Sequence, residues 1–372
     1  MKRLFHPVLL MMLIIFGCKT MVPVKVRKPA ELNVGSARTI AVLDFDFSGS
    51  WDFSAGEKDT KKLKDIISAV IKKKNNKMPD PDKAYPGRRV SEQFIAKLVQ
   101  NGYYTVIERS KIEEILQEQS LSLSGLVDEN KVVQVGNLAG AQAMITGSGS
   151  YSVKDEGEWE TYKEKIKKDG KKVEVEKQRY KIERKVNVQI TFRIIDISTG
   201  SVIASKTNKQ ANYSDGWSGI DSKYTSTGDD EEAAAKGLPD WQPIVSDLVS
   251  SLLNNTVNQI APHTVTEKRE IESGDSKKME SALEYAKRDM WDEAQEIWLE
   301  VLNKKPNKED KTAATYNIGL YNELFGNLDR AEEFYENAYK LSKDSKYLDA
   351  KARVIKRRKE LQKLQMQESN QQ

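Results

Sequence analysis

The sequence predicts an α/β (α+β) domain of sheet and helices with a polar β-hairpin extension, followed by an all-α unit of paired helices. If residues 39–47 form a strand, apolar side chains lie on both of its faces, which is typical of a sheet covered by helices on both sides. Charges alternate along residues 154–185 on either side of Asp169-Gly170, which indicates a long hairpin. The C-terminal part has helical periodicity and repeats between Ala294 and Ala331. A chain of 372 residues accommodates these parts.

Residues 1–17 are predicted to form a lipoprotein signal peptide. A basic start is followed by an apolar run at 8–16, far shorter than the roughly 20 residues that a membrane-spanning helix needs. The only cysteine, Cys18, follows directly, and this segment resembles the lipobox of bacterial lipoproteins, whose cysteine is acylated. An ordinary cleaved signal peptide that happens to carry a cysteine is the alternative. We expect Cys18 to be lipidated and residues 18–37 to form a lipidated tether.

The composition excludes several classes of function. The chain has 60 Lys and Arg against 56 Asp and Glu, and a net charge of +4 is too slight to indicate a nucleic-acid partner. One cysteine and two histidines exclude an internal disulfide and zinc sites built from four cysteines or from paired cysteines and histidines. The sequence has neither a P-loop nor a glycine-rich dinucleotide fingerprint. We therefore expect no metal and no cofactor.

We also expect that the protein is not an enzyme. His263 is the only histidine beyond the signal peptide, and it follows a helix-ending proline without the surroundings of a catalytic triad. Asp44 and Asp46 fall on the same face of the first strand and could share a proton or a cation. Such a pair is more typical of a strand end that emerges into solvent.

The first half of the predicted sheet domain, which spans residues 38–262, alternates strands with helices. A polar insertion at 57–83 separates the first strand from the rest. Beyond it, Asn101-Gly102 ends one helix and a capping box that starts at Ser110 opens another. The expected elements are strand 39–47, helix 63–71, helix 90–98, strand 103–108, helix 110–119, helix 128–139 and strand 141–150.

The second half of this domain begins with the polar hairpin. Strands 186–194 and 202–208 follow, the first with one apolar face. An amphipathic helix then starts at Trp241 and ends before Pro262. Residues 263–276 are expected to form a linker.

The C-terminal part resembles two tetratricopeptide (TPR) repeats over residues 277–342. The TPR period is about 34 residues, so extra residues fall in the loop between the repeats. Small residues allow the two helices of a repeat to cross closely, and large aromatic residues fill the gaps beside them. We expect 343–372 to form a solvating helix and a polar tail. The TPR-defining residues are Ala282, Tyr285, Ala294, Pro306, Gly319, Ala331 and Ala338.

Short motifs follow one another along the sheet domain: Ile40-Ala-Val-Leu-Asp-Phe45, Val106-Ile-Glu-Arg-Ser110, Ser122-Leu-Ser-Gly125, Val135-Gly-Asn-Leu-Ala-Gly-Ala141 and Ile145-Thr-Gly147. Together they resemble the CsgG family, named for the curli-secretion channel of the bacterial outer membrane. The resemblance implies a periplasm-facing α/β domain that can assemble into a ring. The motif residues of interest are Glu108, Arg109, Gly125, Gly136, Gly140 and Gly147.

The charged hairpin departs from the membrane-inserting hairpins that the resemblance implies for the channel. A membrane-spanning strand needs roughly 9–11 residues with an apolar face, and a charge at mid-bilayer costs about 2–4 kcal/mol. One face of 154–185 includes Lys172 and Arg184, and the other includes Lys181. The second candidate region, 212–238, is rich in Asp, Ser and Gly. The sequence therefore disfavours a pore.

We predict a lipid-anchored, non-catalytic interaction or scaffold protein of the bacterial envelope, at the outer membrane and facing the periplasm or the surface. Its layout resembles that of spirochaetal outer-membrane lipoproteins. The expected partners are the bilayer through acylated Cys18, a protein or peptide through the TPR unit, and further copies through the CsgG-like domain. Two alternatives stay open. One is a subunit of an outer-membrane secretion channel for fibre or protein export, and the other is an outer-membrane lipoprotein that binds haem or a small ligand.

Overall fold

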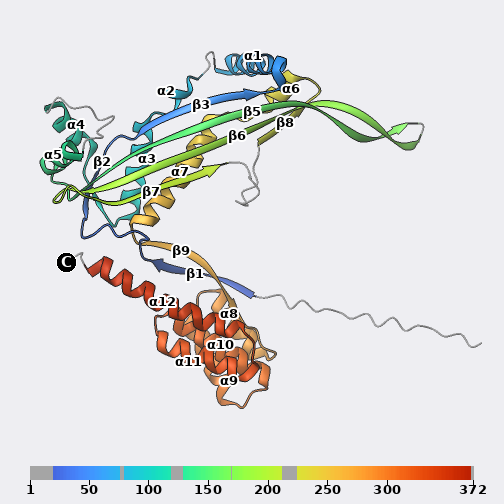
Figure 1. Ribbon diagram of the computed structural model, residues 1–372. Coiled ribbons are helices and arrows are strands. Elements are labelled where there is room, and N and C mark those ends of the chain that lie inside the picture. The colour runs from blue at the N-terminus through green and yellow to red at the C-terminus, as the bar shows by residue number, and fades with distance from the viewer. Residues whose placement is uncertain (1–19, 76–78, 119–128, 169, 212–223, 370–372) are drawn as a thin grey trace, which may run out of the picture. The chain divides into compact units, whose positions relative to one another are not determined.

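A computed structural model of the chain describes residues 20–75, 79–118, 129–168, 170–211 and 224–369 (Figure 1). The chain divides into two compact units that do not follow chain order. The helical unit joins the N-terminal segment up to Pro29 with Thr264–Glu368, and the sheet unit comprises Ala30–His263. The sheet unit is therefore inserted into the sequence of the helical unit.

The sheet unit contains a sheet of mixed direction. Its strands are β2 (Thr39–Val42), β3 (Asp46–Ser54), β4 (Thr105–Val106), β5 (Ala143–Lys168), β6 (Lys171–Asp196), β7 (Val202–Ala211) and β8 (Tyr224–Gly228). The neighbours are β4, β2, β5, β6 and β7 in that order, while β3 pairs with β5 and β8 pairs with β6 farther along these long strands. β2 is parallel to β4 and β5, and β3 is parallel to β5. The pairs of β6 with β5, β7 and β8 are antiparallel.

Helices cover both faces of this sheet. They are α1 (Gly56–Asn75), α2 (Pro81–Ala84), α3 (Gly87–Asn101), α4 (Arg109–Glu118), α5 (Glu129–Ala139), α6 (Glu231–Lys236) and α7 (Trp241–Ile260). Ile40 and Val42 pack into a core with α3 and α7, whereas Ala41 and Leu43 pack into a core with α4 and α5. The alternation in the first strand thus correctly predicts a sheet that is buried on both sides.

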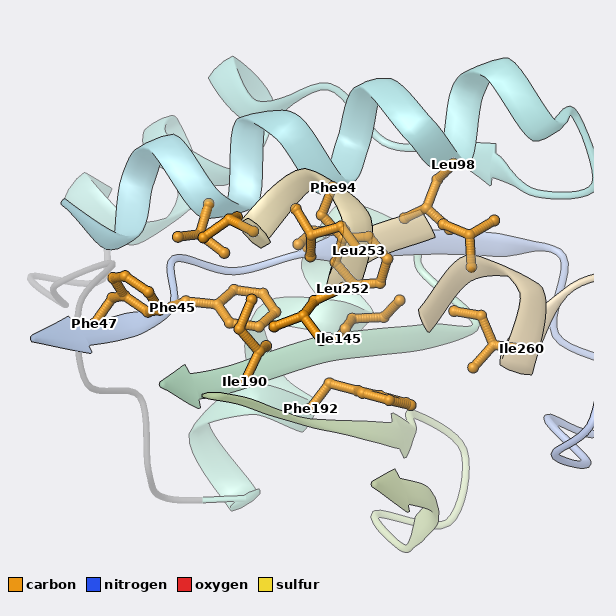
Figure 2. Packing of buried hydrophobic residues seen from close by; sticks show 14 of the residues in the cluster. Phe45, Phe47, Phe94, Leu98, Ile145, Ile190, Phe192, Leu252, Leu253 and Ile260 are labelled. Atoms are coloured by element: carbon orange, nitrogen blue, oxygen red, sulfur yellow. The ribbon is translucent and has the colours of Figure 1, made fainter. Parts of the chain in front are cut away.

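The larger core lies between the sheet and the pair α3 and α7 (Figure 2). Phe94 and Leu98 of α3 and Leu252 of α7 are buried there with Ile190 and Phe192 of β6. A further cluster lies along the sheet, where α1 and α6 pack against the middle of β6. The helices thus cover the inner part of the long strands, where the buried apolar side chains lie.

Several element boundaries differ from the sequence-based expectations. Gly102 ends α3 as predicted, with a left-handed φ of +74°. The expected strand 39–47 is instead divided into β2 and β3, which both pair with β5. The interruption falls at Asp44, whose side chain binds α4 rather than facing solvent. The expected strand 141–150 continues to Lys168, because the polar hairpin is a direct extension of β5 and β6.

β5 and β6 form the long hairpin that the sequence predicts. Lys168 pairs with Lys171, and the same register places Asp155 opposite Arg184. The turn contains Gly170, while Asp169 lies outside the described residues. The hairpin extends well beyond the helices that cover the rest of the sheet (Figure 1).

A buried ion pair holds the base of this hairpin. In the sequence Arg184 stands among the charges of the polar hairpin, but the structure buries it with Asp155, at 2% and 0% side-chain exposure. Arg184 Nε and Nη2 each donate to an oxygen of Asp155 at 2.7 Å. Trp51 Nε1 donates to the same carboxylate at 2.9 Å, and Arg184 Nη1 donates to the carbonyl oxygen of Pro239 at 2.5 Å. Every charged group here therefore has partners, as burial requires.

The helical unit consists of two helical pairs, a final helix and a two-stranded ribbon. Its elements are β1 (Thr20–Lys28), β9 (His263–Ile271), α8 (Lys277–Lys287), α9 (Trp291–Asn303), α10 (Lys308–Leu324), α11 (Leu328–Ser342) and α12 (Lys346–Ser369). α8 packs on α9, α9 on α10, and α10 on α11. In the part of the chain that the structure describes, no helix has the length and apolar character needed to cross a bilayer.

The ribbon corrects two expectations. Residues 18–37 were expected to form a tether and 263–276 a linker, but Thr20–Lys28 and His263–Ile271 pair as β1 and β9. The Val and Lys residues that alternate in this tether segment have the period of a strand with one buried face. Val22, Val24 and Val26 are buried in the core of the helical unit, together with Ile271 of β9.

We predict that Asp155→Asn lowers the free energy of unfolding by about 3–5 kcal/mol, because it leaves the Arg184 charge buried without a carboxylate. The double variant Asp155→Leu with Arg184→Met removes both charges and is expected to recover most of this loss. Urea unfolding followed by tryptophan fluorescence measures both. Equal losses in the single and double variants would contradict a buried pair.

Candidate interaction surfaces

An ion pair connects the interrupted first strand to α4. Arg109 Nη1 and Nη2 bind Asp44 Oδ1 and Oδ2 at 2.5 and 2.7 Å. Ser91 of α3 donates to the same carboxylate at 2.8 Å, and Glu113 binds Arg109 Nε at 2.7 Å. Both members of the pair are largely buried, with 12–13% side-chain exposure. The cluster joins β2, α3 and α4, so it fixes the helices around the end of the strand.

This arrangement does not provide the acid pair that the sequence left open. Burial alone would raise the pKa of Asp44, but the hydrogen bonds from Arg109 and Ser91 lower it overall. Asp44 is therefore held as a carboxylate by a fixed cation, and Asp46 is exposed on β3. Among the described residues, no group of three or more His, Cys, Asp or Glu side chains is placed to hold a metal ion.

The remaining motif residues of the sheet unit have mainly packing roles. A Cβ at Gly147 would meet the ring of Phe45 at 2.1 Å, and one at Gly136 would meet Ile197 at 2.4 Å. Gly140 has a φ of +77° at the turn that follows α5. Glu108 is exposed at the start of α4, and Gly125 lies outside the described residues. These positions bring elements close together and do not converge on a reactive group.

The predicted TPR residues lie mostly where helices cross. The alanines among them are fully buried between helices, and Pro306 is half-buried in the turn before α10. A Cβ at Gly319 would meet the Tyr335 ring at 2.8 Å. Tyr285 was expected in the core, but 38% of it is exposed. The buried alanines are Ala282, Ala294, Ala331 and Ala338.

One face of α10 already carries a strand of the same chain. Asn317 donates to the backbone oxygen of Glu272 at 2.7 Å and accepts from its backbone nitrogen at 3.0 Å. Tyr316 donates to the backbone oxygen of Glu270 at 3.2 Å. Asp310 Oδ1 accepts from the backbone nitrogen of Asp275 at 2.6 Å. The helices thus bind β9 and the segment after it much as a groove would bind an extended peptide, so this face is occupied.

A buried carboxylate joins four elements of the helical unit. Glu323 of α10 accepts from Arg353 of α12 through both oxygens at 2.8 Å, and from Arg269 of β9 at 3.1 Å. Tyr335 of α11 donates to it at 2.7 Å. Burial alone would raise the pKa of Glu323, but these partners lower it overall, with Arg353 first. Glu323 is therefore ionised, and it ties the ribbon to three helices.

A groove of about 700 Å³ lies beside β1 on the helical unit. Val22 and Val24 line it together with Met290 and Trp291 from the α8–α9 turn. Phe325, at the end of α10, also lines it and is 52% exposed. Its lining also includes the carboxylates of Asp289, Asp292 and Glu293 and the ammonium groups of Lys25 and Lys287. A groove with apolar side chains and charges of both signs suits a segment that has both apolar and charged side chains.

The outer part of the hairpin is a second exposed surface. Pairing of β3 with β5 ends at Glu156, and β8 covers β6 only from Tyr180 to Arg184. Within the described chain, the two strands beyond these points therefore pair only with each other. Trp159 stands at the base of this part, 49% exposed and edge-on to Tyr180. An isolated two-stranded hairpin is only marginally stable in water, so this surface is suited to a partner.

Sequence reasoning missed most of these partnerships. The Asp155–Arg184 pair had a signal, since a turn at Asp169-Gly170 sets these residues opposite each other. The other partnerships had no such signal in the sequence. Glu323 and Arg269, for example, come from elements far apart in the sequence.

We predict that Glu323→Gln destabilises the helical unit at neutral pH and reduces its loss of stability on acidification. The pKa of Glu323 is lowered by folding, so its contribution is present above the unfolded value of about 4.3 and is lost as the pH falls through the folded value. Urea unfolding at neutral and acid pH measures this, with exposed Glu293→Gln as the control. A pH dependence identical in both variants would contradict the role of Glu323.

Comparison with known families assigns the sheet unit. The model of the family described as "Curli production assembly/transport component CsgG" matches residues 73–282. A second family, "Domain of unknown function (DUF6340)", matches residues 280–365 in the helical unit. A search of curated proteins gave no match.

Solved structures give distant likenesses. The "LpoB C-terminal domain from Salmonella enterica" is 13% identical, with a TM-score of 0.26, over 48% of this chain and 87% of that one. The "PelC dodecamer from Paraburkholderia phytofirmans" is 14% identical, with a TM-score of 0.27, over 66% and 100%. Lipoprotein GNA1162 from Neisseria meningitidis is 11% identical, with a TM-score of 0.24, over 59% and 99%. Such values carry no functional inference. The family match, in contrast, spans more than half of the chain, and the chain belongs to the CsgG family.

Proposed function

We propose that this protein is a lipid-anchored, non-catalytic scaffold of the bacterial cell envelope. In this proposal the sheet unit assembles with further copies of the chain, and the helical unit binds a protein partner close to the membrane. Membership of the CsgG family supports a role in the envelope or in secretion. The single observation that carries the proposal is that β1, which begins at Thr20, is a structural strand of the helical unit.

The position of β1 determines what a lipid on Cys18 would hold. Thr20 is two residues beyond Cys18, and two extended residues reach about 7 Å at most. Acylation of Cys18 would therefore place the start of β1 at the bilayer surface, without the long tether that the sequence suggested. The lipid would hold the helical unit directly, and the sheet unit would follow through its two connections.

β1 is fixed strongly enough to transmit such an anchor. Lys28 binds Glu267 of β9 at 2.8 Å and Glu360 of α12 at 2.9 Å. Arg357 donates to the backbone oxygen of Arg27 at 2.6 Å. Burial alone would raise the pKa of Glu267, but Lys28 and Arg269 lower it to about 2. The Lys28–Glu267 pair is therefore ionised at neutral pH.

The groove beside β1 is the partner site that the helical unit offers best. The face of α10 that binds β9 is already filled, whereas Phe325 and Met290 in this groove are 52% and 37% exposed. We assign it to an extended protein segment with apolar and charged side chains. Haem is a weaker candidate, because residues 264–372 contain no histidine or cysteine to bind its iron.

Self-assembly is assigned to the surface around Trp159, where the exposed outer part of the hairpin begins. Trp159 is a large exposed aromatic side chain, the kind that contributes most energy when it is buried in an interface. The alternative of a secretion-channel subunit also requires assembly, and it differs in requiring ion conduction. Single-channel recording on the assembled protein separates the two, since a scaffold gives no conductance.

We predict that Cys18→Ala releases the protein from membranes washed in high salt, which screens the attraction between exposed charges and headgroups. The exported wild-type protein should incorporate labelled palmitate and partition into the detergent phase, whereas the variant should do neither, because no acyl chain is attached. Lys19→Ala is the control and should behave as the wild type. A Cys18→Ala protein that stays just as firmly membrane-bound would contradict the lipid anchor.

We also predict that the chain from Lys19 to Gln372 forms oligomers at micromolar concentration and that Trp159→Ala reduces its mass to that of a single chain. Sedimentation velocity measures this. Val99→Ala removes a comparably exposed apolar side chain, at 61% exposure on α3, and should leave the mass unchanged. A wild-type chain that sediments as a monomer throughout would exclude self-assembly through the hairpin.

A further inference from the structure

The end of the hairpin concentrates positive charge in an unfavourable arrangement. The register places Lys167 opposite Lys172 and Lys168 opposite Lys171. All four side chains are exposed, and like charges directly opposite each other destabilise a strand pair. Among the residues that the structure describes, no carboxylate forms an ion pair with any of them. An anionic surface would relieve this repulsion.

The part of the hairpin just before this end has opposite charges across its strands. Arg179 pairs with Glu160 directly across the strands, and Lys177 binds Glu164 at 2.7 Å. Opposite charges thus neutralise each other along this part, whereas like charges face each other at Lys167, Lys168, Lys171 and Lys172. This contrast makes the last residues of the hairpin a distinct feature.

The same end is amphipathic. Ile166 lies opposite Val173, and the alternation of a strand places Tyr162 and Val175 on the same face. The charged side chains of Glu164, Lys168, Lys171 and Lys177 flank these apolar side chains on that face. Val173 is 41% exposed. The opposite face of this end carries only charged side chains, namely Lys163, Lys165, Lys167, Lys172, Glu174 and Glu176. Apolar side chains near the base of the hairpin face the helices, so the apolar face changes side toward the end.

We propose that the hairpin tip, defined as residues 162–168 and 170–177, docks onto the anionic headgroup surface of a lipid bilayer. The lysines contact the headgroups, while Ile166 and Val173 enter the boundary with the acyl chains. The charged opposite face keeps the tip at the surface and prevents it from crossing the bilayer. A soluble polyanion would satisfy the lysines but leave the apolar face in water, so a bilayer matches both features. The proposal does not depend on acylation of Cys18.

The test uses the chain from Lys19 to Gln372, which contains both units and lacks the acylated cysteine. We expect it to co-sediment with vesicles of phosphatidylglycerol and phosphatidylcholine but not with phosphatidylcholine alone. Binding should weaken with added salt, because screening reduces the attraction between exposed charges. Failure to bind the anionic vesicles would overturn the proposal.

Two matched variants locate the site. Lys→Gln substitutions at Lys167, Lys168, Lys171 and Lys172 should reduce binding about tenfold or more. The control carries Lys→Gln at four exposed lysines elsewhere in the sheet unit, and it should bind like the wild type although its net charge is the same. The control positions are Lys61, Lys72, Lys74 and Lys131. Equal binding by the two variants would overturn the proposal and leave the tip lysines as guards against edge-to-edge pairing.

A second pair of variants tests the apolar face without removing any lysine. The double variant Ile166→Ser with Val173→Ser should bind anionic vesicles several-fold more weakly. Val173→Trp should show a blue shift in its added tryptophan emission when vesicles are present. If polyphosphate binds as tightly as vesicles, and Val173→Trp shows no shift, the tip recognises a soluble polyanion and the bilayer proposal fails.

Discussion

The pairing of β1 with β9 is the constraint on which the rest of the structure depends. Val22, Val24 and Val26 of β1 are buried among the helices that end the sequence, so the first described strand is part of the last structural unit. The sheet unit therefore leaves and re-enters the helical unit through two strands of one ribbon. Glu323 strengthens this arrangement, because it binds Arg269 of β9 and Arg353 of α12 at once.

In the sheet unit, burial under helices likewise holds one part of the long strands and leaves the other part exposed. Its helices cover the inner part of β5 and β6, and this cover continues past the buried Asp155–Arg184 pair to Tyr180 and Ile182. Beyond Glu156 and Tyr180 the two strands pair only with each other among the described residues, and cross-strand ion pairs replace a core. Such an exposed extension is suited to contacts outside the sheet unit. We propose two of them: a second copy of the chain at Trp159 and a bilayer surface at the hairpin tip.

Local patterns in the sequence predicted the parts of the fold that depend on neighbouring residues. The alternation from Ile40 to Leu43, the helix end at Gly102 and the hairpin turn were all correctly predicted. The sequence did not predict β1 as a strand, because its apolar residues are few and Pro23 interrupts them. In addition, its partner β9 follows only after the whole sheet unit in the sequence. The partners of Asp44 and Glu323 were missed for the same reason, since only the folded chain brings them together.

The most direct test of this account is proteolysis of the acylated protein on membranes, with protease sites introduced at the connections after Pro29 and after His263. If β1 is a structural strand of the helical unit, the fragment from Thr264 onward stays on the membrane after both cuts, held by β1 although no peptide bond joins them. The sheet unit is released or stays according to its own contacts. Release of the fragment from Thr264 onward, with only the short N-terminal peptide left on the membrane, would contradict the account.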